Sequence, residues 1–174
     1  MSTRPDNAIP STHAVKDFDQ AFDRSFALVA YVLNRHLIDH MLRAARLLTE
    51  GDIDALVVWG VLAHQNVVHL MPPGSVPSTV LDDHGMPPDS EQRMAPLRLR
   101  TLAEITRIPR ETVRRKLHAL EERRYVTRSS RGWLVSTERN EPELREFTRE
   151  SVRRLLATAD EIRAVLGAAD RARR

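Results

Sequence analysis

The feature that most constrains this fold is an uninterrupted apolar periodicity near the N-terminus. Between Asp17 and Thr49, apolar side chains recur at steps of three and four residues, and no proline or glycine occurs before Gly51. The pattern predicts a helix of roughly 30 residues, which would be about 45 Å long. Because one small domain cannot cover such a helix, we expect part of its apolar stripe to need a partner.

A second helix and a long loop are expected next. Asp52 or Asp54 can cap a helix that runs to about Leu70, and the apolar run Ala55–Ala63 indicates that this helix is buried. Residues 17–70 are therefore predicted to form a helical frame. Residues 71–96 hold six of the ten prolines, which predicts a long linker loop.

A third long helix is predicted near the C-terminus. Pro142 suits the first position of a helix, and an amphipathic pattern continues from there to about Ala168. We therefore expect a helix within residues 140–168 that serves dimerisation together with the N-terminal frame. Residues 1–16 are polar and are expected to form a flexible tail.

The composition excludes several classes of protein and site. The chain has no cysteine, which rules out a disulfide scaffold, a thiolate nucleophile and Cys-ligated zinc or iron–sulfur centres. The longest apolar runs, Phe26–Leu33 and Ala55–Ala63, are far shorter than the ~20 residues that span a bilayer. Residues 1–16 also lack the apolar region of a secretory signal. These features predict a soluble cytoplasmic protein with no membrane partner.

Positive charge is concentrated in one block of the chain. The formal net charge is only +3, but residues 93–131 carry 12 basic and 4 acidic side chains, a net of +8. Residues 1–92 carry 6 basic and 12 acidic side chains, a net of −6. Such a concentration of positive charge is the electrostatic footprint of a polyanion-binding element.

The basic block begins with a predicted strand and a short helix. Leu97 and Leu99 alternate with arginines, which predicts a strand. Thr101 and Glu104 have the spacing of a capping box, which predicts that a helix starts at Thr101. Pro109 disfavours the helical conformation of the residue before it, so this helix is expected to end there.

The rest of the block predicts a second helix and a β-hairpin. The helix is expected at residues 110–123, with its inner stripe formed by Val113, Leu117 and Leu120. Its outer face is expected to carry Arg110, Glu111, Arg114, Arg115 and His118. Residues 125–127 and 133–135 read as strands joined by a turn at Gly132. The predicted fold class is therefore mainly α: a winged helix-turn-helix at 97–136, flanked by long terminal helices.

This pattern resembles known families of transcriptional regulators. Residues 102–105 and 109–115, with Arg-Glu-Thr-Val-Arg-Arg, resemble the helix-turn-helix of Crp-type regulators, and Arg-Gly-Trp-Leu-Val at 131–135 resembles the wing of GntR-type regulators. The order of the elements resembles the MarR family, in which the terminal helices build the dimer. The resemblance implies a bacterial homodimer that binds double-stranded DNA in the cytoplasm, associated with the nucleoid.

Two positions depart from the pattern of these families. Arg107 and Arg124 stand where the turns usually carry glycine. A non-glycine residue in a left-handed conformation costs about 1–2 kcal/mol. Either the turns differ here, or the strain is tolerated because both arginines reach DNA phosphates.

The Crp-like match also implies which residues contact DNA. Arginine can donate two parallel hydrogen bonds to guanine, and a carboxylate can accept one from cytosine. The expected base contacts are Arg110, Glu111, Arg115 and Arg114, the last of which would alternatively hold a phosphate. The expected phosphate or minor-groove contacts are Thr101, Arg107, Thr112, Lys116, Arg128 and Arg131, of which the last two belong to a wing at 127–133.

Other kinds of site receive less support from the sequence. Trp59 and His64 are candidates for the lining of a small-molecule effector pocket, although Trp59 also suits a plain core position. His36 and His40 have metal-ligand spacing, but no metal site is expected because a pair of partly exposed histidines on a dimer helix is the stronger explanation. No P-loop, G-x-S-x-G or G-x-G-x-x-G motif occurs, so neither an enzyme nor a cofactor is expected.

The hypothesis from the sequence is a homodimeric regulator that reads a pseudo-palindromic operator with helix 110–123 and the wing. Two alternatives remain at this point. One is a winged helix used as a protein–protein interaction module, and the other is an architectural protein that binds DNA without sequence preference.

Overall fold

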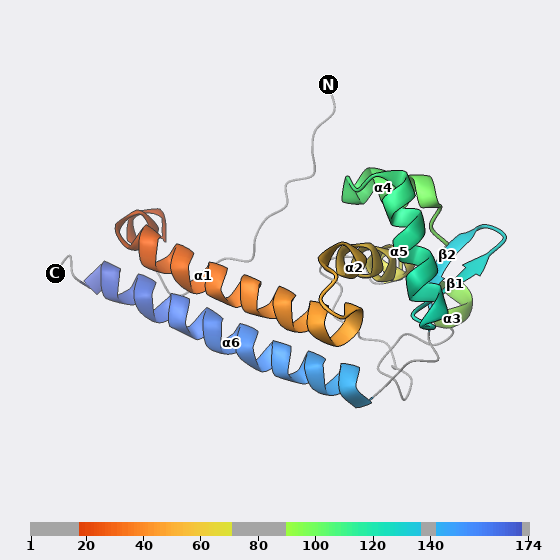
Figure 1. Ribbon diagram of the computed structural model, residues 1–174. Coiled ribbons are helices and arrows are strands. Elements are labelled where there is room, and N and C mark those ends of the chain that lie inside the picture. The colour runs from red at the N-terminus through yellow and green to blue at the C-terminus, as the bar shows by residue number, and fades with distance from the viewer. Residues whose placement is uncertain (1–17, 71–89, 137–141, 172–174) are drawn as a thin grey trace, which may run out of the picture. The chain divides into compact units, whose positions relative to one another are not determined.

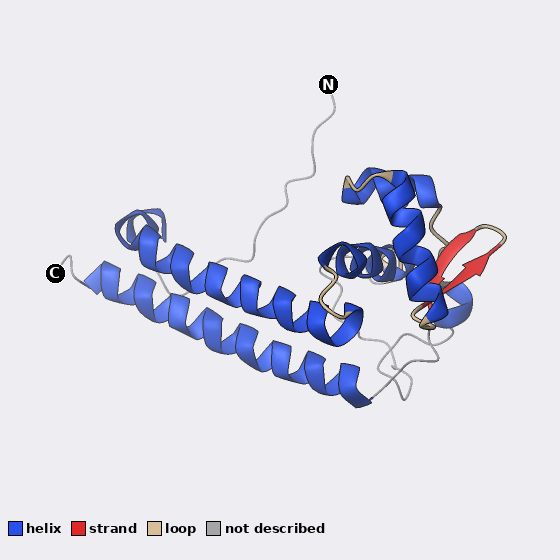
Figure 2. Ribbon diagram, in the orientation of Figure 1, coloured by secondary structure: helices blue, strands red, loops and turns tan. Residues whose placement is uncertain are grey.

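The computed structural model describes residues 18–70, 90–136 and 142–171, and within them the fold is mainly helical with one antiparallel β-hairpin (Figures 1 and 2). The elements are α1 (Phe18–Thr49), α2 (Ile53–Val67), α3 (Ser90–Arg93), α4 (Leu99–Thr106), α5 (Arg110–Glu122), β1 (Val126–Ser129), β2 (Gly132–Val135) and α6 (Pro142–Arg171). The mainly α prediction is therefore confirmed. Among the described helices, none is long and apolar enough to cross a membrane.

The described residues fall into two compact units. One unit contains α1 up to His40 together with α6 from Glu146, and the other lies within Met41–Arg145. The expected tail at 1–16 and most of the expected loop at 71–96 lie outside the described residues. At the end of that loop region the expectation is wrong, because residues 90–93 form the single turn α3.

The first unit is an antiparallel pair of long helices (Figure 1). The uninterrupted periodicity of the sequence produces α1, and Pro142 starts α6 as predicted, since a helix needs no amide donor at its first position. Ala21 and Val29 of α1 pack with Leu166 of α6 to form a small buried core. Both helices also expose many large apolar side chains: Phe18, Phe26, Leu28, Tyr31, Leu33, Leu37, Ile38, Val152, Leu155 and Leu156.

The second unit is built around α2. Asp52 caps this helix by accepting a hydrogen bond from the Ala55 amide at 3.0 Å, which confirms one of the two predicted caps. Helix α2 packs against α4, α5 and β2. The shared core consists of Val58, Leu62, Leu102, Val113, Leu117, Leu120, Val126 and Trp133. Three of these side chains form the predicted inner stripe of α5, which is therefore confirmed.

The segment before α4 differs from its prediction. Only Leu97 pairs in a β-like manner, with Trp133 as its partner: each amide donates to the other's carbonyl at 2.9 Å. Helix α4 then starts at Leu99, with Arg98 as an N-cap that makes no side-chain capping bond. The capping box at Thr101 and Glu104 is thus wrong, because Glu104 instead accepts a hydrogen bond from Arg100 at 2.8 Å.

A close backbone approach holds the hairpin against this segment. Strands β1 and β2 pair in register, with Ser129 opposite Gly132 at the turn. Gly132 has a φ of +151°, and a Cβ atom on it would lie 2.6 Å from the carbonyl oxygen of Leu97. Because only glycine avoids this contact, Gly132 is what lets the Leu97 strand segment approach β2.

Candidate nucleic-acid interface

The outer face of α5 is formed by charged side chains. Arg110, Glu111, Arg114 and Arg115 are all exposed, whereas the expected outward residue His118 is half-buried with its ring edge-to-face against Trp133. The spacing of the four exposed residues places them on one side of a helix. Within the described residues, Arg110 and Arg115 make no ion pair. The structure therefore leaves these two guanidinium groups available to an external acceptor.

Glu111 and Arg114 bind each other instead. The Arg114 Nε donates to both carboxylate oxygens of Glu111, at 3.2 and 3.0 Å, and Nη2 donates to Oε1 at 2.5 Å. The hydrogen bond from Arg114 holds the pKa of Glu111 below its ordinary value. This bidentate pair orients the planar Arg114 guanidinium along the helix surface. A base contact by either residue would have to compete with, or build on, this internal pair.

Lys116 lies on a different side of α5 from the exposed arginines. It is half-buried, and its ammonium group donates to the Asp52 carboxylate at the N-cap of α2. Burial raises the pKa of Asp52, but the hydrogen bonds from Lys116 and the Ala55 amide outweigh this effect and leave that pKa below its ordinary value. The expected phosphate contact of Lys116 would require this ion pair to break, so we assign Lys116 to fastening α5 on α2.

The pair predicts a specific pH dependence of stability. Because the pKa of Asp52 is lower in the folded state, its contribution is present above its ordinary pKa near 3.8 and is lost as the pH falls through the folded value. Asn caps a helix as well as Asp does but carries no charge, so Asp52→Asn removes the ion pair with Lys116 and keeps the cap. This variant should have a lower stability at pH 7 and a smaller loss of stability in acid. Asp52→Ala also removes the cap and should cost about 1 kcal/mol more.

The check is the urea midpoint of each variant measured from pH 7 down to pH 2. If Asp52→Asn and the parent lose stability in parallel over this range, the assigned role of the pair is wrong.

The turns on both sides of α5 contain left-handed arginines. Arg107 has φ 59° and ψ 16° at the C-cap of α4, and Arg124 has φ 61° just after α5. Of the two alternatives left open by the sequence, the structure keeps the usual turn geometry and places arginine in it. Both side chains are exposed.

The hairpin turn carries the two expected wing arginines. Arg128 and Arg131 are exposed, and the Arg128 guanidinium lies 5.9 Å from the centroid of the Trp133 ring. The turn between the strands is closed by Ser129, which donates a hydrogen bond to the Gly132 carbonyl at 2.9 Å. The basic hairpin thus packs Arg128 against the buried Trp133 ring.

The two predicted threonine contacts are less accessible than the arginines. Thr101 lies in the first half of α4 and Thr112 in the first turn of α5, and each is half-buried. The structure thus brings the candidate residues together on α5, its preceding turn and the hairpin. It separates Lys116 from them by its internal ion pair.

The effector pocket expected at Trp59 and His64 stays a prediction. Trp59 packs against the core of the second unit, with its ring edge-to-face on Tyr125, and His64 is exposed. A cavity of about 330 Å³ lies between α1 and α6. Within the described residues, no group of three or more His, Asp or Glu side chains is placed to hold a metal ion.

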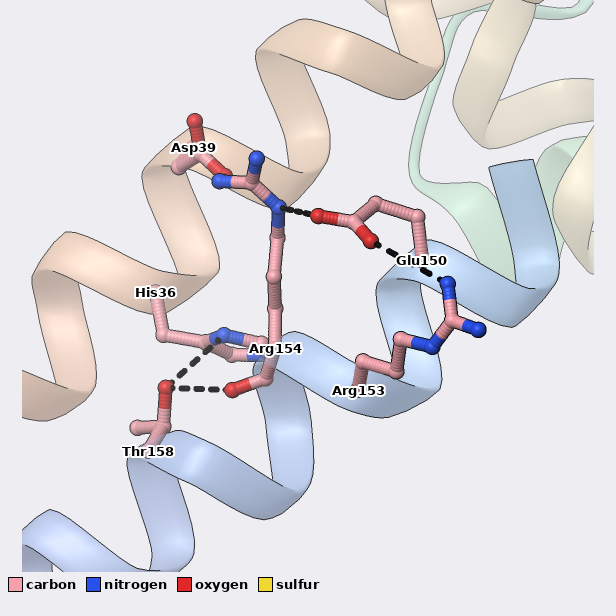
Figure 3. A network of polar contacts seen from close by, with 6 residues as sticks. All are labelled: His36, Asp39, Glu150, Arg153, Arg154 and Thr158. Atoms are coloured by element: carbon pink, nitrogen blue, oxygen red, sulfur yellow. Dashed lines mark hydrogen bonds and ion pairs between the residues drawn. The ribbon is translucent and has the colours of Figure 1, made fainter. Parts of the chain in front are cut away.

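Polar contacts join α1 and α6 (Figure 3), and several of the side chains that make them also line this cavity. The Arg154 guanidinium bridges Glu150 at 2.8 Å and Asp39 at 3.4 Å, and the Thr158 hydroxyl lies 3.2 Å from the His36 ring nitrogen. The His40 ring stacks on the His36 ring and also contacts the Phe147 ring. The His36 and His40 rings therefore take part in the packing of α1 on α6.

One positioning residue was not identified from the sequence. Asn66 is fully buried in α2, and its Nδ2 donates to the carbonyls of Ala95 and Trp133 at 2.8 and 3.3 Å. Its Oδ1 accepts from the Val135 amide at 2.8 Å. The side chain thus joins α2, the segment before α4 and the hairpin. The available signal was a lone amide side chain near the end of an apolar helix.

Comparisons with known proteins add no relationship. A scan against protein-family models, a search of curated proteins and a search of solved structures each found no match to this chain.

Proposed function

We propose that the protein is a DNA-binding transcriptional regulator of the winged helix-turn-helix class. The observation that carries the proposal is the division of α5: its inner stripe is completely buried, and its outer face exposes Arg110 and Arg115 without an internal ion-pair partner among the described residues. The core of a protein–protein interface is depleted of charged residues, which argues against that role for a face formed by four charged side chains.

Within that class, we propose a MarR-like homodimer that reads a pseudo-palindromic operator. Helix α5 would enter the major groove of each half-site, where Arg110 and Arg115 donate to guanine O6 and N7. Arg128 and Arg131 of the hairpin would contact the minor groove or phosphates beside it. Glu111 would read cytosine while keeping Arg114 oriented. The net charge of +8 in residues 93–131 supports a polyanionic partner.

The homodimer is supported by the apolar surface of α1 and α6. Phe26, Leu37 and Leu156 are 58%, 48% and 58% exposed, and ten other large apolar side chains of these two helices are exposed as well. So many exposed large apolar side chains on one helix pair are rarely left in water. A second copy of the same helix pair would cover it and place two α5 helices in one assembly.

A charge introduced into this surface is expected to separate the copies. Leu156→Glu should convert a dimer to a monomer at micromolar concentration, because a carboxylate would be buried in the apolar interface. The neighbouring residue Ala157 is also exposed but lines the polar cavity beside Arg154, so Ala157→Glu is the matched control and should remain dimeric.

Sedimentation or light scattering gives the mass of both variants and of the parent. A monomeric parent, or an Ala157→Glu variant that dissociates as readily as Leu156→Glu, would contradict the proposed interface.

The experiment that tests the function is capture of genomic DNA fragments by the purified protein at increasing salt. The proposal predicts that a small set of fragments is retained after most have been released. Uniform release of all fragments with a steep salt dependence would indicate architectural binding. Absence of binding at low salt would indicate an interaction module.

A further inference from the structure

The two left-handed arginines beside α5 differ from the third strained residue of the second unit. Glu50 also has a positive φ, 55°, but its carboxylate pairs with Arg123 at 3.3 Å, so its side chain has a role inside the fold. Arg107 and Arg124 make no side-chain hydrogen bond or ion pair with the described residues, and both are exposed.

Both turns require the left-handed conformation. After α5, the Tyr125 amide donates to the Leu120 carbonyl and the Arg124 amide to the Glu121 carbonyl, each at 2.9 Å. This is the pattern of a helix end that normally carries glycine at the position of Arg124. After α4, the Ile108 amide donates to the Thr106 hydroxyl at 3.3 Å, and Arg107 makes the turn toward Pro109.

Glycine adopts this conformation without steric cost, and Asn or Asp are the residues that tolerate it best after glycine. Arginine has neither advantage, and no described contact of its side chain offsets the strain. Strained residues without a structural reason tend to be found at functional sites.

The two positions bracket the proposed recognition helix. Arg107 stands three residues before the first residue of α5, and Arg124 stands two residues after its last. In helix-turn-helix domains, the helix before the recognition helix crosses the DNA backbone, and in homeodomains the C-terminal end of the recognition helix contacts it. Arg107 lies at the end of α4, the helix before α5, and Arg124 lies at the C-terminal end of α5.

We infer that Arg107 and Arg124 hold DNA phosphates at the two ends of α5, and that this binding is why arginine occupies two positions where the fold alone favours glycine. The inference rests on the proposed DNA-binding function and adds Arg124 to its contact surface. It implies that stability and DNA affinity change in opposite directions at these two residues.

The test replaces each arginine by glycine, singly and together. Each change should raise the melting temperature by about 2 °C, because the backbone strain is released. Each should also weaken binding to a fragment captured by the parent about 3- to 10-fold and reduce the slope of log affinity against log salt by about 1. Arg107→Lys and Arg124→Lys, which keep the charge, should bind within about 2-fold of the parent.

Glu50→Gly is the matched control, since it relieves the strain of the same left-handed backbone conformation without removing a proposed DNA contact. It should leave DNA affinity and salt slope unchanged. Glycine variants of Arg107 and Arg124 that gain stability but bind DNA like the parent would overturn the inference and leave the proposed function intact. Absence of DNA binding by the parent would overturn both.

Discussion

Gly132→Ala is expected to destabilise the second unit by about 2–4 kcal/mol, a large part of the 5–15 kcal/mol that usually stabilises a domain. The new methyl group would lie 2.6 Å from the Leu97 carbonyl oxygen and 2.7 Å from its carbon. Both are backbone atoms, so no side-chain rotation relieves the contact. The paired hydrogen bonds between Leu97 and Trp133 would have to break or lengthen.

The consequence extends to the core because Trp133 is buried there and its carbonyl also accepts from Asn66. Gly60→Ala is the matched control: Gly60 lies inside α2, and a Cβ atom on it would meet nothing within 4 Å. This control should gain about 0.5–1 kcal/mol from the better helix propensity of alanine. Urea unfolding of both variants decides the matter, and a Gly132→Ala protein as stable as the parent would refute the close approach.

Arg110→Ala combined with Arg115→Ala is expected to weaken binding to a captured genomic fragment by about 100-fold or more. Each arginine–guanine contact contributes roughly 1–3 kcal/mol of discrimination, and two are removed together. Folding should be unaffected, because both side chains are exposed and make no ion pair among the described residues. We therefore expect the double variant to keep the melting temperature of the parent while its DNA binding is lost.

The control for lost charge is Arg46→Ala combined with Arg145→Ala. Both of these residues are exposed, and they lie on α1 and α6 rather than on α5, its flanking turns or the hairpin. This variant has the same net charge as the α5 variant, so a general electrostatic effect would weaken both equally. Equal weakening in a fluorescence-anisotropy titration would exclude base readout by α5.

The parts of the fold that sequence reasoning predicted correctly depend on local patterns. Helices α1 and α5 follow from apolar spacing, and the Asp52 cap and the Pro142 start follow from the chemistry of single residues at helix ends. Such signals involve only a few neighbouring residues, so they can be recognised in a single amino-acid sequence.

The parts that sequence reasoning missed depend on contacts between distant residues. The start of α4 is set by the pairing of Leu97 with Trp133, 36 positions away, which ends the extended segment two residues before the capping box. Lys116 looked like a surface cation because its partner Asp52 lies 64 positions away. Asn66 joins three segments that no local pattern connects.

The candidate site was predicted in composition but not in its internal pairing. The exposed arginines of α5 were expected from its helical period, and they are exposed. The pairing of Glu111 with Arg114 depends on side-chain rotamers, which the sequence does not specify.

The central claim is sequence-specific DNA binding, and the most direct measurement compares two affinities of the parent protein. One is for a captured genomic fragment, and the other is for a shuffled fragment of the same length and base composition, both at about 0.15 M salt. The proposal predicts that the captured fragment binds at least about 1,000-fold more tightly. Equal affinity for the two fragments would contradict it.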